Sequence, residues 1–451
     1  MASDALSLDI AGLTSAYRDG RLHPSGVLEQ LFAAIEADTR GINAFCLLDR
    51  AAAEREAEAS GRRWREGRPL SVLDGVPVSI KDLVNVAGWP TRRGSLSGSD
   101  EPVPQDAPGV TPLRAGGAVL FGKTTTTEFG WTVGSSNPQA GTTLNPAAPG
   151  REVGGSSSGA AAQVAAGWGP LALGSDAGGS VRLPASWTGT VGFKPSFGAI
   201  PLAPASAFAE FAHLGTFTRS VADAVLAMQV LSRADARDPS SLFVRGEAPP
   251  DRPLRIAWAL SVGSSQAVQP AVAEAVRALV RRLADAGHSV VEWPEAANDR
   301  ALDMWSVWVS RIHESFVDWS DAQRAQLSPG LQAAFEQGAA QSPAELARAR
   351  ARLRAMAGAL AQRFTDIDLL ITPSTPGAAP PLGDMGGGAW FESVGGFTYP
   401  FNLTQQPALN LPLGADAEGA PFGVQLVGPR FHDAAVLRAG ARIEALLVEV
   451  R

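Results

Sequence analysis

Hydrophobic and polar positions in the first part of the chain follow a helical period. Between residues 8 and 65, leucine, valine, isoleucine and tyrosine recur at roughly helical spacing, and 51–65 form a charged amphipathic stretch. This pattern predicts that 8–65 are mostly helical. A more continuous apolar run over 72–80 predicts a buried strand, with Lys81 near its end.

Strand-like and helix-like segments alternate through most of the remaining chain. Further helices are expected over 111–115, 160–166, 270–287 and 433–450, and further strands over 118–121, 252–260, 289–293, 367–372 and 421–428. The order strand, helix, strand over 252–293 implies a parallel pair of strands. The alternation as a whole predicts an α/β protein.

Two segments interrupt this alternation. Residues 296–365 have helical periodicity, a polar outer face and several aromatic residues, and we predict that they form an inserted helical cap. Residues 375–402 form a long loop rich in glycine and proline, with more aromatics at 386–401. We predict that most of these aromatics fill the core, and the others favour an apolar or aryl ligand.

Composition narrows the class of protein. The chain has 451 residues and a net charge of −7, which argues against nucleic-acid binding. The N-terminus lacks the pattern of a secretory signal, and no apolar stretch is long enough to span a membrane. The single cysteine, Cys46, lies in an apolar run and is expected to be a buried structural thiol. We expect a cytoplasmic monomer or homodimer that binds no membrane.

The candidate chemistry lies in a lysine and two glycine-serine loops. Lys81 ends the sequence GVPVSIK, Ser156 lies within GGSSSG (154–159), and Ser180 within GSDAGGS (174–180). Of the 38 basic residues only three are lysines, and arginine cannot act as a base because it stays protonated. Retention of lysine at position 81 therefore suggests that a titratable amine is needed there.

Other hydrolytic arrangements fit the sequence poorly. The five histidines lack metal-ligand spacing, so no metal or cofactor is expected. Residues 155–159 match G-x-S-x-G, but a loop with two prolines precedes them where that motif needs a strand. No lysine has a serine three positions before it, which excludes an S-x-x-K motif. Each feature also has a purely structural interpretation: Lys81 as a solvated strand end, 154–159 as a flexible linker and 178–180 as a tight turn. The occurrence of all three within 81–180 favours a catalytic site.

These motifs resemble the amidase signature family of hydrolases. The resemblance is carried by 75–82, 122–125, 128–129, 154–195, 407–414 and 423–428, and it is strongest over 71–200. It implies a single domain over 1–451 with the amidase signature fold, in which a large, twisted, mixed central β-sheet is flanked by helices on both faces.

The resemblance also implies roles for individual residues. Ser180 matches the nucleophile, Lys81 the general base, and Ser156 the serine that bridges them and follows a cis peptide bond. The backbone amides of Ala177, Gly178 and Gly179, together with that of Ser180, match the oxyanion hole. Auxiliary roles are expected for a further set of residues, either in hydrogen bonding or in orienting the loops by ion pairing: Ser157, Asp82, Asp176 and Arg182.

The family resemblance predicts an amidase that hydrolyses the C–N bonds of small amides through an acyl-enzyme on Ser180. Carbamates (urethanes) and esters fit the same serine chemistry. One alternative is an A-type subunit of a glutamyl-tRNA amidotransferase acting with partner chains, although Leu183 differs from the glutamine common there. The other is a non-catalytic small-molecule binding protein, against which the intact serine and lysine residues argue.

Overall fold

An eleven-stranded mixed sheet forms the centre of the computed structural model, which describes residues 5–241, 252–293, 300–383, 385 and 389–448. The strand order is β1-β3-β2-β6-β8-β7-β12-β13-β11-β9-β10. The strands are β1 (Phe45–Leu48), β2 (Pro77–Lys81), β3 (Val119–Thr124), β6 (Leu171–Asp176), β7 (Val191–Lys194), β8 (His213–Thr218), β9 (Arg255–Trp258), β10 (Ser289–Glu292), β11 (Leu369–Pro373), β12 (Ala408–Ala415) and β13 (Pro421–Val427). A separate small hairpin pairs β4 (Ser136–Asn137) with β5 (Gly141–Thr142).

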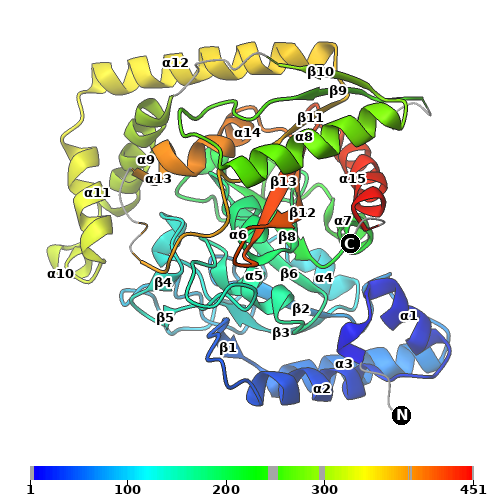
Figure 1. Cartoon of the computed structure of the whole chain (residues 1–451). Helices are drawn as coiled ribbons and strands as arrows, with labels where there is room; N and C mark the ends of the chain where they lie inside the picture. Colours follow the sequence, from blue (N-terminus) through cyan, green and yellow to red (C-terminus); the bar gives the residue numbers. More distant parts are fainter. Residues whose placement is uncertain (1–4, 242–251, 294–299, 384, 386–388, 449–451) are drawn as a thin grey trace.

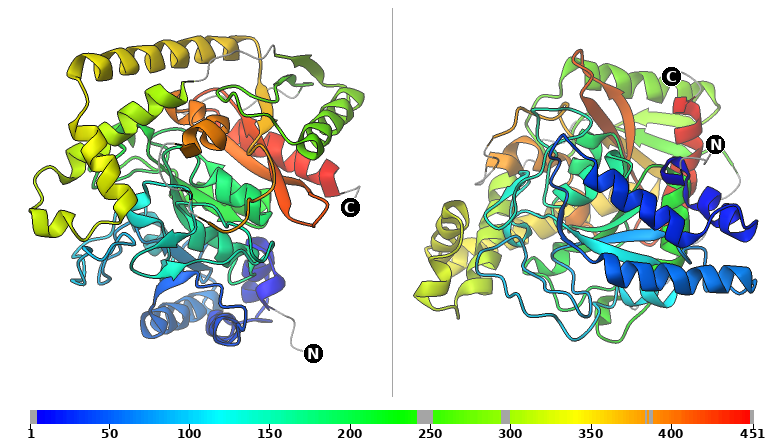
Figure 2. Two further views of the ribbon diagram at one scale, coloured as in Figure 1. Left: turned by 60° about the vertical axis from the view of Figure 1, so that its left-hand side comes forward. Right: turned by 90° about the horizontal axis from the view of Figure 1, so that it is seen from below.

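Helices surround this sheet, as Figures 1 and 2 show. They are α1 (Ile10–Arg18), α2 (Pro24–Glu36), α3 (Arg50–Arg65), α4 (Thr111–Ala115), α5 (Ser158–Ala165), α6 (Arg182–Thr188), α7 (Val221–Leu231), α8 (Pro270–Asp285), α9 (Ala301–Phe316), α10 (Asp321–Arg324), α11 (Pro329–Ala339), α12 (Pro343–Gln362), α13 (Ala389–Ser393), α14 (Pro400–Leu403) and α15 (Asp433–Val448). The N-terminal helices (blue) and α12 (yellow) lie at opposite ends of the molecule in Figure 1. Among the described residues, no helix combines the length and the apolar character that crossing a membrane requires.

The two faces of the sheet carry separate hydrophobic cores. Val78 and Ile80 of β2 pack with apolar residues of α7, α8 and α15. Val119 and Phe121 of β3 point the other way and pack with α2 and α5. The predicted mixed sheet with helices on both faces is confirmed, as is the parallel pairing of β9 with β10 across α8. The sheet is mixed: the groups β3-β2-β6 and β11-β9-β10 are parallel, antiparallel strands join them in the middle, and β1 pairs antiparallel with β3 at one edge.

The sequence analysis did not predict some of the strands. Residues 45–48 form β1 inside the stretch expected to be mostly helical, because they pair with β3 at the edge of the sheet. Cys46 on this strand is only partly buried, which corrects the expectation of a buried thiol. Desolvation and the nearby Asp82 carboxylate raise the pKa of Cys46 to about 12. The central strands β6, β7, β8 and β12 also went unpredicted. Strands such as β6 and β8 are buried on both faces and therefore lack polar-apolar alternation.

The segment predicted as a helical cap contains α9, α10, α11 and α12, and α9 packs against both α11 and α12. Its first predicted residues, 296–299, lie outside the described part of the chain. The aromatic residues of α9 join a hydrophobic cluster with Trp390 and Phe391 of α13, which lies in the stretch predicted to be a loop. Residues 384 and 386–388 of that stretch, and 449–450 of the last predicted helix, also lie outside the described residues.

Candidate active site

Strand alternation places Lys81 on the face of β2 that α5 covers. Side chains on one strand point alternately to opposite faces, so Ser79 and Lys81 share a face while Val78 and Ile80 take the other. The Ser79 hydroxyl hydrogen-bonds the side chain of Gln163 in α5. Ser156 and Ser157 immediately precede α5. Lys81, which contacts both serines, therefore lies at the start of this helix.

The Lys81 ammonium group is fully buried among serine hydroxyls. Its Nζ lies 2.7 Å from Ser156 Oγ, 2.8 Å from Ser157 Oγ and 3.0 Å from Ser175 Oγ. Within the described chain it has no ion-pair partner. A longer contact of 3.5 Å joins it to the backbone carbonyl of Ser175. An amine held by hydroxyl groups and a carbonyl can lose its proton without leaving a carboxylate unpaired.

Burial lowers the pKa of Lys81 well below its ordinary value. Desolvation is the main cause, and the negative charge of Asp176 opposes it in part. The start of α5 adds a positive helix-dipole end beside the amine, which also favours the neutral form. Lys123 differs, because its ammonium pairs with Asp82 at 2.7 Å. The third lysine, Lys194, is fixed by the backbone carbonyls of its neighbours in the fold.

A pH–rate profile tests this reading of Lys81. A base must be deprotonated to accept a proton, so kcat/KM for an amide should rise with pH as the free enzyme loses the Lys81 proton. Because burial lowers that pKa, the rise should end in a plateau well below pH 10.4, the ordinary value for lysine. A rate that continues to climb through pH 10 would contradict a neutral Lys81.

Ser156 lies in a tightly confined turn before α5. The Gly155–Ser156 peptide bond is cis, as the family resemblance implied. A Cβ atom on Gly155 would lie 2.3 Å from the carbonyl oxygen of Gly134, so only glycine fits before the serine. The Ser156 carbonyl accepts a hydrogen bond from the Thr127 amide, which further fixes the turn.

Ser180 belongs to the loop between β6 and α6. The residue is 6% exposed, and its hydroxyl is neither fully buried nor hydrogen-bonded to any described residue. Lys81, Ser156 and Ser157 are brought into direct contact, whereas no hydrogen bond joins Ser180 to Ser156 in the described chain. Within the described chain, the hydroxyl of Ser180 therefore has no hydrogen-bond partner.

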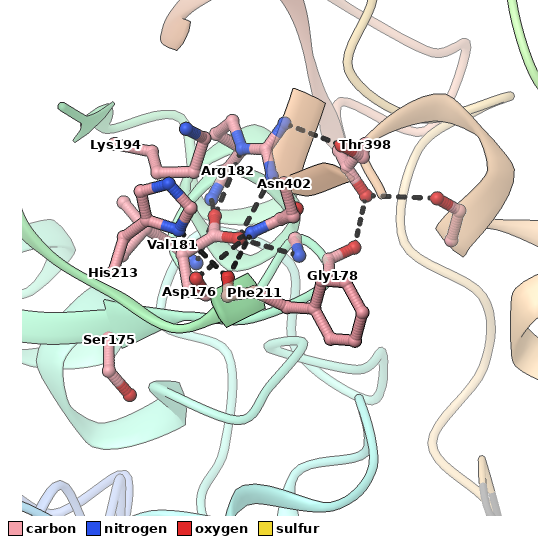
Figure 3. Close-up of polar contacts among 12 residues, drawn as sticks. Ser175, Asp176, Gly178, Val181, Arg182, Lys194, Phe211, His213, Thr398 and Asn402 are labelled. Atoms are coloured by element: carbon pink, nitrogen blue, oxygen red, sulfur yellow. Dashed lines mark hydrogen bonds and ion pairs between the residues drawn. The ribbon is translucent and has the colours of Figure 1, made fainter. Parts of the chain in front are cut away.

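A buried ion pair holds the Ser180 loop in shape. Both oxygens of Asp176 accept hydrogen bonds from the Arg182 guanidinium at 2.9 Å (Figure 3). The same carboxylate accepts the backbone amides of Gly179 at 2.8 Å and Val181 at 3.1 Å. Asn402 donates to it as well. These charges and donors, led by Arg182, outweigh desolvation and hold the pKa of Asp176 well below its usual range.

This arrangement changes the expected oxyanion hole at one position. The Gly179 amide already donates to Asp176, so it is not free to bind an oxyanion. The amides of Ala177, Gly178 and Ser180 have no acceptor among the described residues. Gly179 adopts φ +136°, and a Cβ there would lie 2.3 Å from Thr398 Oγ1, so its glycine is required by the backbone.

A cavity of about 400 Å³ opens at Ala177, three residues before Ser180, and Ser180 itself is not among the residues that line it. Ser156, Ser175 and Ala177 line it together with apolar side chains. Phe316 of α9 and Trp319 also line it, so the predicted cap contributes directly to the cavity. Most of the other aromatics of that segment and of 389–401 are buried in the core, as predicted.

Ser175 is the residue that sequence analysis missed. Its hydroxyl contacts Lys81, and its backbone carbonyl accepts a hydrogen bond from Ser157 at 3.1 Å. The available signal was its place in the sequence GSDAGGS (174–180) that leads to Ser180, because the strand β6 that holds it was not predicted. No group of three or more histidine, cysteine or acidic side chains is placed to hold a metal ion in the described ranges.

Comparison with known proteins agrees with this geometry. The sequence model of the Amidase family matches residues 26–437. The chain is 32% identical to an acylamidase of Rhodococcus erythropolis, over 97% of this chain and 95% of that protein. Its structure superposes on 6-aminohexanoate cyclic dimer hydrolase with a TM-score of 0.87 and 29% identity, over 98% and 97% of the two chains. A bacterial aryl acylamidase of the amidase signature family gives a TM-score of 0.87 with 27% identity, over 97% and 96%.

The chain belongs to the amidase signature family, and it is an amide hydrolase.

Proposed function

We propose that the enzyme cleaves small amides through a Ser180 acyl-enzyme, with Lys81 as the base and Ser156 as the proton carrier. The observation that carries this proposal is the buried Lys81 amine, 2.7 Å from Ser156 Oγ and without an ion-pair partner in the described chain. No such role suits Lys123, whose ammonium is paired with Asp82.

The proposed reaction has two stages. Neutral Lys81 takes the proton of Ser156, which takes the proton of Ser180 as Ser180 Oγ attacks the carbonyl carbon. The resulting oxyanion accepts hydrogen bonds from the free amides of Ala177, Gly178 and Ser180. The C–N bond then breaks while Ser156 returns a proton to the leaving amine. Water hydrolyses the acyl-enzyme by the same route and releases the acid.

Apolar or aryl amides suit the cavity best. Phe129, Phe316 and Trp319 gather at one side of it, with ring centroids 4.8–5.8 Å apart, and aliphatic side chains form much of the remainder. Such walls favour apolar groups, because binding removes apolar surface from water. The acylamidase and aryl acylamidase relatives support this substrate class and argue against the amidotransferase alternative. Aryl carbamates and esters present the same carbonyl to Ser180 and are proposed as further substrates.

A fluorophosphonate probe tests the assignment of the nucleophile. We expect the probe to add once to the wild-type enzyme, with peptide mass spectrometry placing the adduct on Ser180. The Ser180→Ala enzyme should remain folded by circular dichroism, stay unlabelled, and lose amidase activity by about 10⁴-fold or more. An adduct on Ser156, or a Ser180→Ala enzyme with near-normal activity, would refute the assignment. Comparing kcat/KM for p-nitroanilides, aryl carbamates and primary aliphatic amides then tests the substrate class.

A further inference from the structure

Arg93 is the one charged side chain that lines the active-site cavity in the described part of the chain. The other lining residues are apolar, apart from four serines. Ser156 lines the same cavity, so a ligand held at the proposed proton carrier shares its enclosure with the Arg93 guanidinium. Serine hydroxyls are neutral, which leaves Arg93 as the only lining group with a charge to offer an anion.

The backbone presents Arg93 in an uncommon conformation. Arg93 has φ +59° and Phe129 has φ +49°, a region that non-glycine residues avoid. The Phe129 amide donates to the Arg93 carbonyl at 2.8 Å, so the two residues hold each other in place. Such conformations concentrate at functional sites, where the surrounding structure enforces them. Both side chains also line a neighbouring cavity of about 390 Å³, so Arg93 lies where the two cavities meet.

The Arg93 guanidinium lacks a partner of its own. It forms no hydrogen bond or ion pair with any described residue, although it is only partly exposed. The opposite charge that acts on it is Asp82, which forms no ion pair with Arg93: Asp82 Oδ1 pairs with Lys123 at 2.7 Å, and Asp82 Oδ2 has no hydrogen-bond partner among the described residues. Exposed Glu101, on the wall of the neighbouring cavity, does not pair with it either. The adjacent arginine, Arg92, differs in being paired with Asp100.

A partly desolvated and unpaired guanidinium is costly, and a bound anion would relieve that cost. Burial lowers the pKa of Arg93 and the Asp82 charge opposes this, yet an arginine side chain stays protonated. The planar guanidinium offers two parallel N–H donors to a carboxylate, which is its best-matched partner. In an otherwise uncharged cavity, this pairing would select among substrates.

We infer that Arg93 binds a carboxylate carried by the substrate, so that the preferred substrates are amides with an acidic group at a distance from the cleaved bond. This inference rests on the proposed function and deepens it. The apolar walls would hold the alkyl or aryl part of such a substrate, and the guanidinium would fix its acidic end.

Matched substrate pairs test the inference. Glutaric acid mono-p-nitroanilide carries a carboxylate on the acyl side, and pentanoyl p-nitroanilide is its neutral counterpart. The compound 4-(pentanoylamino)benzoate carries a carboxylate on the amine side, and pentanoyl p-toluidide is its neutral counterpart. We expect at least one acidic member to exceed its neutral counterpart by about tenfold or more in kcat/KM, mainly through a lower KM.

Substitutions of Arg93 and Arg92 test whether Arg93 causes the preference for acidic substrates. Arg93→Met should lower kcat/KM for the preferred acidic substrate by about 10- to 100-fold and change the neutral counterpart by less than about threefold. Arg93→Lys should retain part of the preference for the acidic substrate, because lysine keeps the positive charge but lacks the two parallel N–H donors of the guanidinium. Arg92→Met, which removes the paired neighbour, should leave the preference in place.

The possible outcomes separate the two proposals. Hydrolysis of the neutral anilides without any acidic preference would overturn the role of Arg93 and leave the proposed function standing. An equal loss on acidic and neutral substrates in Arg93→Met would also overturn it, because a purely structural residue would act that way. If no anilide is hydrolysed and the fluorophosphonate does not label Ser180, the proposed function fails and the inference fails with it.

Discussion

Replacement of Lys81 by methionine is expected to reduce kcat/KM for any amide substrate by about 10⁴-fold or more. Methionine has a similar length but cannot accept a proton, and Lys81 is the one titratable group in hydrogen-bond contact with Ser156 among the described residues. The loss should appear in kcat, because the base acts in the transition state and not in substrate binding. Steady-state kinetics on a p-nitroanilide, with a long assay to measure the residual rate, provides the measurement.

Lys81→Arg is the matched control for this experiment. It keeps a basic side chain at the end of β2, but the guanidinium carries a permanent positive charge and cannot be deprotonated in a protein. Loss of activity as severe as in Lys81→Met would show that the free base, and not the charge, is required. Retention of activity within about tenfold in either variant would mean that another group activates Ser180.

Replacement of Arg182 by methionine is expected to cost about 3–5 kcal/mol of unfolding free energy. The change leaves Asp176 charged and buried without its partner, and it removes hydrogen bonds to the Thr398 carbonyl, Gln425 and Asn402. Activity should fall as well, since Asp176 holds the amides that shape the Ser180 loop. Urea denaturation at pH 7 followed by circular dichroism gives the stability difference.

The stability difference between the wild-type protein and Arg182→Met should become smaller as the pH falls. Arg182 holds the pKa of Asp176 low in the folded protein, so the ion pair stabilises the fold above the pKa of an unfolded aspartate, about 4, and its contribution is lost as the pH falls. The gap between wild type and Arg182→Met should therefore narrow below about pH 4.

An exposed ion pair provides the comparison for Arg182. Arg21 pairs with Asp19 on the surface, with side chains 61% and 49% exposed, and Arg21→Met should cost less than about 1 kcal/mol. A similarly small cost for Arg182→Met would show that the buried pair does not hold the loop.

Much of the candidate site could be predicted from the sequence, because its proposed catalytic residues lie in short, recognisable motifs. Lys81 ends an apolar strand, and glycines precede both Ser156 and Ser180 because a Cβ atom on Gly155 or Gly179 would lie 2.3 Å from a neighbouring atom. These requirements produce a pattern of residue types that can be recognised in the sequence. The exclusion of other bases also needed only the positions of the lysines and histidines.

The unpredicted features depend on pairing between distant segments. Strand β6 carries little alternation, and only its position between β2 and β8 makes it a strand and brings Ser175 to Lys81. The engagement of the Gly179 amide by Asp176 could not be foreseen either, because a backbone amide has the same identity in every residue and its partner is set by loop geometry.

The sequence by itself determined the α/β class, the family and the three residues of the proposed proton pathway, since each requires particular residue types at particular spacings. Only the tertiary structure decided what surrounds them. Burial, which no single segment controls, lowers the pKa of Lys81 and leaves Arg93 as an unpaired charge on the wall of an apolar cavity. Desolvation is a property of the packed molecule, so the proposed protonation state of Lys81 and the proposed substrate preference both depend on the fold.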